Sequence, residues 1–269
     1  MVRVTTTDRR GVLRAGAGLV AGGALAAGCS ATGAAPHVTT SDASPSGAPG
    51  TATARSATPS TAPVPRPFPN QPAQITHGPR DKPRVALTFH GQGDPVLARA
   101  LLTAAERHGA RLTVLAVGTW LEQYPQMARR ILDGGHDLGN HTRRHLAVNA
   151  MSEADARAEI TGCADRIKGL TGSIGTWFRP SRAPTASPLV QRLARDAGYP
   201  HVLSYDVDSL DHTRPGAAAV TRKVMAEVRG GSVVSLHFGY PDTVSALPDV
   251  LDELAHRGLR AVTTTELLS

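Results

Sequence analysis

Short apolar runs alternate with longer amphipathic stretches along the chain from Lys82 to its last residue. The runs have the length of buried strands, and the amphipathic stretches have the period of helices. The predicted strands lie at residues 84–89, 111–117, 136–139, 177–180, 201–205, 232–238 and 260–263. The helical patterns begin near Pro95, Thr119, Ser152, Ser187, Gly216 and Thr243. Such an alternation is typical of a parallel α/β fold.

The pattern says less about whether the sheet closes into a barrel. Seven strand-like runs and six helical stretches follow one another without an internal linker, which favours a single, closed or nearly closed β/α barrel. A doubly wound open sheet is the alternative, because period and length do not distinguish a closed sheet from an open one.

The N-terminal part of the chain has a different composition. Ala, Ser, Thr, Pro and Gly dominate as far as about Pro72, and such a stretch cannot bury enough apolar surface to offset its chain entropy. We therefore expect residues 30–75 to form a disordered tether and residues 76–269 to form the folded domain. The formal net charge is +7, but most of the basic excess lies N-terminal of Asp81. The domain thus lacks the basic stripe of a nucleic-acid-binding protein.

Residues 1–29 have the features of an export signal. Arg9 and Arg10 precede a weakly apolar run that ends at Cys29, as in a twin-arginine signal. The run is too short to span a bilayer as a mature helix. Residues 25–29 also resemble a bacterial lipoprotein box, so membrane contact through a lipid on Cys29 and cleavage without a lipid are both open. Either way we expect a protein outside the cytoplasm, extracellular or anchored to the outer face of the cell membrane.

Polar side chains follow several of the predicted strands. The strand at residues 84–89 ends in His90, two glycines and Asp94, and His141 and His145 follow the strand at residues 136–139. Loops after the strands carry the chemistry of many α/β proteins. Two histidines four residues apart fall on one side of a helical turn, from which both imidazoles can reach one metal ion.

The later strands add further polar groups at the same expected edge. Arg179 follows Trp177, three carboxylates lie between residues 206 and 211 beside His212, and an apolar strand runs directly into His237. A carboxylate near an imidazole raises the basicity of the imidazole and fixes the tautomer of its ring. Surface turns and buried core histidines are the simpler explanations of each feature taken alone.

Together these residues resemble the polysaccharide deacetylases of the NodB-homology type, carbohydrate esterase family 4. The resemblance implies a distorted seven-stranded β/α barrel that removes acetyl groups from N- or O-acetylated sugars with a divalent metal ion. His141-Thr142-Arg143-Arg144-His145 matches a family motif that makes His141 and His145 metal ligands. Residues 234–237 match the motif that makes His237 the general acid.

Two further motifs of the family have looser counterparts. Arg179-Pro180 matches a motif whose arginine braces the catalytic base. Residues 208–211 match a motif whose last carboxylate, here Asp211, orients the acid, with His212 where the family has an aromatic residue. We expect Asp208, His212 and Trp177 to contact the substrate.

The first motif of the family is the one that departs. The family has Thr-Phe-Asp-Asp-Gly-Pro, with the general base followed by a metal ligand, whereas this chain has His90 and Gly91 at those places. A two-residue insertion would bring Asp94 in as the third ligand, and His90 would then act as the base, held neutral by the cation of Arg179.

The sequence therefore predicts an exported, metal-dependent deacetylase. Zinc suits two imidazoles and a carboxylate with an open position, although other divalent ions tolerate the same set. We expect a monomer whose substrate is an acetylated polysaccharide of the cell envelope or its surroundings. Two alternatives remain: a glycan-binding barrel that has lost its base, and a metal-dependent amidohydrolase acting on a small amide.

Overall fold

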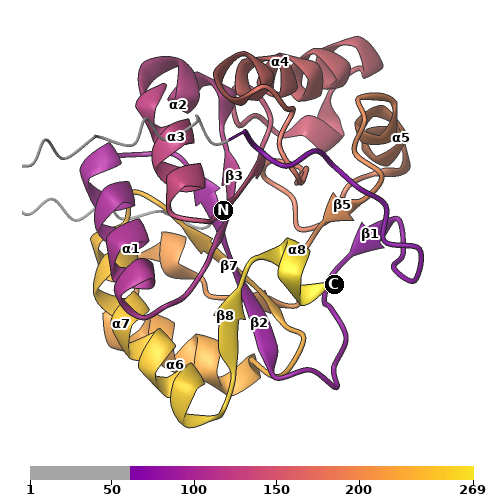
Figure 1. Cartoon of the computed structure of the whole chain (residues 1–269). Helices are drawn as coiled ribbons and strands as arrows, with labels where there is room; N and C mark the ends of the chain where they lie inside the picture. The colour runs from indigo at the N-terminus through magenta and orange to yellow at the C-terminus, as the bar shows by residue number, and fades with distance from the viewer. Residues whose placement is uncertain (1–60) are drawn as a thin grey trace, which may run out of the picture. The chain divides into compact units, whose positions relative to one another are not determined.

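The computed structural model describes residues 61–269 (Figure 1), so the predicted export signal and most of the predicted tether lie outside the described residues. The main sheet has the strand order β4-β3-β2-β7-β6, and β8 pairs with β2 as well. All of its pairs are parallel, as the alternating pattern predicted. The strands are β2 (Arg84–Gly91), β3 (Thr113–Ala116), β4 (Asp137–Asn140), β6 (Val207–Asp208), β7 (Val233–His237) and β8 (Arg260–Val262).

A second, two-stranded sheet continues the wall of the barrel. It pairs β1 (Gln74–Ile75) with β5 (Val202–Leu203), also in parallel. Single bridges from Asn140 to Phe178 and from Phe178 to Val202 join β4 to β5. The predicted strand at residues 177–180 is thus reduced to one bridging residue, and the barrel is distorted at this point.

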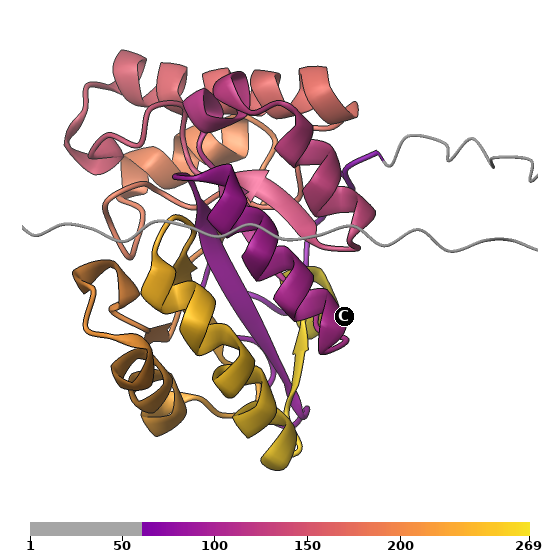
Figure 2. The ribbon, with the colours of Figure 1, turned by 90° about the vertical axis from the view of Figure 1, so that its left-hand side faces the viewer.

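Helices cover the outside of this barrel (Figure 1), and they begin close to the predicted positions. Ser152 and Ser187 cap the helices that follow them with their side chains, which satisfies free backbone N–H groups of the first turn. Figure 2 shows α1 and α7 side by side along β2. The helices are α1 (Pro95–Arg107), α2 (Gly118–Gln123), α3 (Gln126–Asp133), α4 (Glu153–Thr171), α5 (Pro188–Asp196), α6 (Ala217–Glu227), α7 (Pro241–His256) and α8 (Thr264–Leu267).

The main hydrophobic core lies between these helices and the sheet. Leu87 and Phe89 of β2 are fully buried in it, together with Leu101 and Leu102 of α1. Cys163 of α4 is buried there as well, as a small core residue. Because apolar side chains of the central strand meet those of the covering helices, the strand ends are held in fixed positions.

The packed part of the chain begins earlier than the predicted boundary at residue 76. Phe68 stacks on Trp177 with 5.4 Å between the ring centroids, and Ala62 is buried. The prediction that Trp177 contacts a substrate is not supported by this arrangement. Its ring is 2% exposed, and its Nε1–H donates to Asp137 Oδ2 at 3.2 Å. Trp177 thus anchors the end of the N-terminal segment rather than facing solvent.

In the described part of the chain, no helix combines the length and the apolar character needed to cross a bilayer.

The core of α1 can be tested by truncating one side chain. Leu101→Ala should lower the free energy of unfolding by about 2–5 kcal/mol, because it removes buried contacts and leaves a cavity. Val96 of the same helix is 65% exposed, so Val96→Ala should change the free energy of unfolding by less than about 0.5 kcal/mol. Denaturant unfolding measures both, and equal losses would contradict the placement of this helix.

Candidate active site

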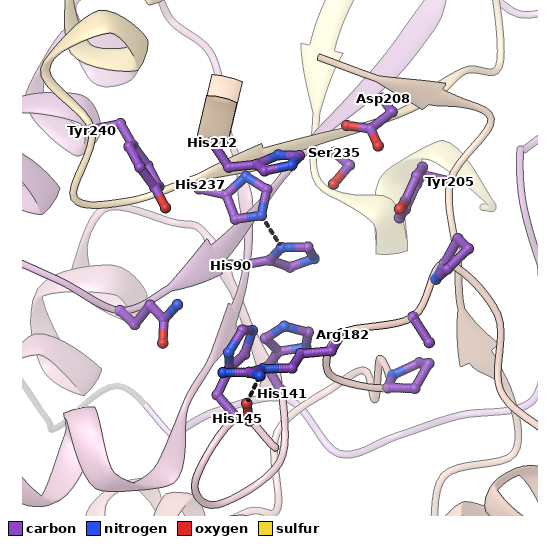
Figure 3. Close-up of a pocket in the computed structure, with 14 residues that line it drawn as sticks. His90, His141, His145, Arg182, Tyr205, Asp208, His212, Ser235, His237 and Tyr240 are labelled. Carbon is purple, nitrogen blue, oxygen red and sulfur yellow. Dashed lines mark hydrogen bonds between the residues drawn. The ribbon is translucent and has the colours of Figure 1, made fainter. Parts of the chain in front are cut away.

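A cavity of about 420 Å³ opens where several parallel strands end (Figure 3). It brings together residues from β2, from the loop after β4 and from the ends of β6 and β7, as expected for the carboxyl edge of a barrel. The labelled residues of its wall are His90, His141, His145, Arg182, Tyr205, Asp208, His212, Ser235, His237 and Tyr240. Most of the residues predicted for the site therefore share one pocket.

His237 and Asp211 form a hydrogen-bonded pair at one side of this pocket. The Nδ1–H of His237 donates to Asp211 Oδ1 at 2.7 Å. Asp211 Oδ2 accepts from the backbone N–H of His237 and from the hydroxyl of Thr243. Burial raises the pKa of the Asp211 carboxyl, but the bonds from His237 and Thr243 outweigh it and leave that pKa below its ordinary value. Asp211 thus stays ionised and holds His237 in one orientation.

His90 connects this pair to the buried cation of Arg179. His90 Nδ1 lies 2.8 Å from His237 Nε2 (Figure 3), and His90 Nε2 lies 3.2 Å from Arg179 Nη1. A guanidinium only donates, so His90 Nε2 must be the acceptor, and the ring proton of neutral His90 sits on Nδ1. That proton is donated to His237 Nε2. One chain of hydrogen bonds therefore fixes the tautomers of both imidazoles.

His141 and His145 do approach each other, with 4.9 Å between their ring centroids. The predicted helical turn between them is wrong, because residues 141–147 form a loop in which Thr142 and His145 have φ values of 66° and 57°. The buried carboxylate of Glu159 shapes this loop by accepting hydrogen bonds from the backbone and the side chain of Arg144. The pair is thus positioned by contacts to other elements and not by helical spacing.

His141 has the features of a metal ligand. Its Nδ1–H donates to the backbone carbonyl of Arg179 at 3.1 Å, which leaves the lone pair on Nε2. His141 Nε2 is the one buried side-chain nitrogen or oxygen in the described residues without a hydrogen-bond partner. Leaving such an atom unpaired costs free energy, so its direction into the pocket fits a bound ion. The chemistry of the two imidazoles therefore suits a divalent metal.

Asp94, the third predicted metal ligand, lies outside the pocket that contains His141 and His145. Asp94 caps α1, and its Oδ1 accepts from the backbone N–H of Val96 at 2.8 Å. It lines a neighbouring cavity instead of the histidine pocket. Gly91 has no room for a carboxylate either, since a Cβ there would lie 2.9 Å from Val114 Cγ1 and 3.1 Å from the Cα of Ala116.

One other group could hold a metal ion in the described part of the chain. Potential ligand atoms of Asp211, His212 and His237 lie within 4.8 Å of one another. Both carboxylate oxygens of Asp211 are already engaged by His237 and Thr243. The hydrogen-bonded arrangement therefore describes this cluster better than metal coordination does.

Three imidazoles of the pocket, those of His90, His141 and His145, are held neutral. Burial lowers the pKa of His90 and of His141 well below the ordinary histidine value, and neighbouring histidines lower both further. Burial and the nearby Arg182 guanidinium lower the pKa of His145 to about 4. Neutral imidazole is the form that binds metal ions, so this electrostatic setting favours coordination over ion pairing.

Several residues of the pocket were not predicted. Tyr205 lies two residues before β6 and Tyr240 three residues after His237, so closeness to the recognised motifs was the available signal. Arg182 has φ 54° and donates from Nε to the carbonyl of His145, which places its guanidinium beside the histidine pair. Asp208 and His212 line the pocket as expected.

Comparison with known proteins gives a consistent result. Residues 77–202 match the family described as polysaccharide deacetylase. The chain is 31% identical over 195 residues to a peptidoglycan N-acetylglucosamine deacetylase of Bacillus cereus, covering 71% of this chain and 90% of that protein. It is 30% identical over 191 residues to a chitooligosaccharide deacetylase of Sinorhizobium fredii, covering 65% of this chain and 87% of that protein.

One similar solved structure belongs to a relative that is described as a pseudoenzyme. The wild-type structure of a pseudoenzyme of carbohydrate esterase family 4 from Bacillus anthracis superposes with a TM-score of 0.69 at 26% identity, covering 74% of this chain and 70% of that one. A mutant of that pseudoenzyme is described as having restored enzymatic activity. The fold seen here therefore occurs in relatives with and without catalysis.

The lowered pKa values of His90, His141 and His145 should make the stability of the protein depend on pH. Their pKa is lower in the folded protein than the ordinary value of about 6.5 in an unfolded chain. As the pH falls from about 6.5 towards 4, the unfolded chain takes up more protons than the folded one, so the stability should fall. Denaturant midpoints at pH 7.5 and pH 5, with a chelator present, measure this loss.

Two variants assign that loss to the pocket. His145→Gln should reduce the difference between the two midpoints, because it removes one of the groups that titrate on unfolding. His256→Gln should leave it unchanged, since the His256 side chain is 81% exposed. If His145→Gln and wild type lose the same stability on acidification, the histidine pair is not the source.

Proposed function

We propose, because this chain belongs to the polysaccharide deacetylase family, that it removes acetyl groups from an N- or O-acetylated polysaccharide of the cell envelope. The observation that carries the proposal is the unpartnered Nε2 of His141, buried in a pocket that also holds His145 and His237. Such a donor set fits a Lewis-acid ion next to a histidine that can transfer a proton.

His141 and His145 are the residues that would hold the metal, and zinc is the proposed ion because imidazole suits it, as it suits other divalent transition metals. When bound, a divalent ion polarises the acetyl carbonyl and lowers the pKa of water. The carbonyl of Arg179 keeps His141 in the tautomer that ligation requires. Asp94 has no part in this proposal, because its carboxylate caps α1 outside the pocket.

His237 is the proposed general acid, and Asp211 orients it through the Nδ1 bond. In the described arrangement His237 Nε2 accepts from His90, so the acid can protonate a leaving amine or alcohol only after this contact opens. His90, braced by Arg179, would accept a proton through Nε2 only at the expense of its bond to the guanidinium. We therefore assign His90 a positioning role before a basic one.

The proposed substrate class and location follow from the relatives. Deacetylases of peptidoglycan and of chitooligosaccharides are similar to this chain over most of its length, and peptidoglycan is a polymer of the cell envelope. Export through Arg9 and Arg10, and a lipid on Cys29, would bring the domain there. Both remain predictions from the sequence.

A second candidate function is glycan binding without hydrolysis. Two observations favour it: both ring nitrogens of His90 are engaged, and Gly91 leaves no space for a carboxylate. A protein of similar fold from Bacillus anthracis is described as a pseudoenzyme of the same family, which supports this second candidate. The two functions differ in whether acetate is released.

Metal content tests the ligand assignment. His141→Ala should weaken zinc binding by about 100-fold, since even changes to residues behind the ligands commonly cost 10–100-fold. Elemental analysis and competition with a chromogenic chelator measure it, and circular dichroism checks that the variant is folded. His212→Ala is the matched comparison and should retain the metal. Loss in His212→Ala but not in His141→Ala would move the ion to the cluster around Asp211.

Acetate release tests the reaction. Zinc-loaded wild type should release acetate from acetylated chitin oligomers or peptidoglycan, and His237→Ala should reduce the rate by about 10²–10⁴ while keeping the metal. A near-normal rate in His237→Ala would assign the acid elsewhere. Wild type that binds these glycans but releases no acetate would establish the binding function instead. Release from a small amide alone would favour the amidohydrolase.

A further inference from the structure

Residues 61–75 pack onto the domain, although they precede the range 77–202 that matches the polysaccharide deacetylase family. We call them the N-terminal strap, which ends in β1 (Figure 1). Ala62 of the strap is 2% exposed, and Phe68 is 8% exposed. The carbonyl of Pro63 accepts from the hydroxyl of Ser173 at 3.1 Å. The strap is therefore a folded part of this chain to which the family match assigns no role.

His201 holds the strap through both nitrogens of its ring. Its Nε2 accepts from the backbone N–H of Phe68 at 2.9 Å, because an N–H group can only donate. The ring proton therefore lies on Nδ1, which donates to the carbonyl of Pro72 at 2.8 Å. His201 is buried, so the loss of either contact would leave a buried polar group without its partner. His201 thus fastens the strap at a point directly before β5.

The end of the strap also sets the position of β5. The carbonyl of Ala73 accepts from the backbone N–H of Val202 at 2.8 Å, and the carbonyl of Ile75 accepts from that of Ser204 at 2.7 Å. The other edge of β5 is joined to the barrel by the single bridge from Phe178 to Val202. The strap therefore supplies most of the backbone pairing that fixes β5 in the wall of the barrel.

The carbonyls at the end of β5 connect the strap to the histidine pocket. Arg179 donates from Nε to the carbonyl of Leu203 at 3.0 Å and from Nη2 to that of Ser204 at 2.9 Å. Its Nη1 donates to His90 Nε2, and His90 in turn donates to His237. A continuous series of hydrogen bonds thus leads from β1 through Ser204 and Arg179 to the two histidines.

We propose that the N-terminal strap positions the histidine pocket and that His201 is the positioning residue that fastens it. Neither the strap nor His201 contributes to the wall of the pocket. Docking of the strap fixes β5, the carbonyls of β5 fix the guanidinium of Arg179, and that guanidinium fixes the tautomer of His90. A buried cation that loses its acceptors is costly, so Arg179 would move if β5 shifted. The inference depends on neither the substrate nor the metal.

The ¹⁵N signals of the His90 ring test this coupling in the metal-free protein, with His90→Gln providing their assignment. His201→Ala should make the backbone amide of Ser204 exchange about tenfold faster, since the strap loses two hydrogen bonds. The two ring signals of His90 should then move towards each other, because the ring begins to exchange between its tautomers. His201→Gln should keep the wild-type signals, since an amide side chain supplies both an acceptor and a donor.

Two further variants separate positioning from general stability. Phe68→Leu removes the ring that stacks on Trp177 and should move the His90 signals in the same direction by less, so it decides the question if His201→Ala does not fold. Leu254→Ala is the control, because it removes a buried side chain of α7, which Figure 1 places away from β1 and β5. It should destabilise the protein and leave the His90 signals unchanged.

Three results would overturn the inference. Unchanged exchange of the Ser204 amide in His201→Ala would show that His201 does not fasten the strap. Faster exchange with wild-type His90 signals would show that the strap and the pocket are not coupled. An equal movement of the His90 signals in Leu254→Ala would reduce the effect to a general loss of stability.

Discussion

Arg179 carries a full positive charge on a side chain without exposed surface, and the surrounding structure satisfies that charge from within. The carbonyls of Leu203 and Ser204 accept two of its hydrogen bonds, and His90 accepts a third. Since an unpaired buried charge is costly, these acceptors must be in place when the barrel forms. The backbone carbonyl of Arg179 in turn accepts from His141. The guanidinium of Arg179 thus sets the end of β5 and the tautomer of His90, and the backbone carbonyl of the same residue sets the direction of the lone pair of His141.

The imidazole at position 90 gives this cation an unusual partner. A carboxylate would neutralise Arg179 as an ion pair, whereas His90 accepts only as a neutral ring. Burial accordingly lowers the pKa of Arg179 to about 10. The charge that a carboxylate would bring is absent, and a hydrogen bond is passed on to His237 instead. The chemistry of the pocket therefore depends on neutral histidines, which suit metal binding and the uncharged acetyl group more than they suit strong base catalysis.

The sequence predicted the parts of this structure that depend on local pattern. Period and length placed the main strands and helices, and residues after strand ends shared one pocket because parallel strands end at one edge. The predictions that were wrong concern features set by contacts between segments distant in sequence. The loop from His141 to His145 is set by Glu159 from another element, and Trp177 is covered by Phe68 from a segment that composition alone assigned to the tether. No local pattern carries this information.

Asp94 illustrates the same limit at the site itself. A carboxylate just before proline fits two descriptions equally well in sequence: a displaced metal ligand and the cap of a helix whose first residue is proline. The decision depends on Gly91, where Val114 and Ala116 pack against the backbone, and on Gly93, whose carbonyl accepts from Trp120. These contacts hold the loop after β2 against α2 and away from the histidines. The same close packing that leaves the histidine pocket without a third carboxylate ligand therefore holds Asp94 in place as the cap of α1.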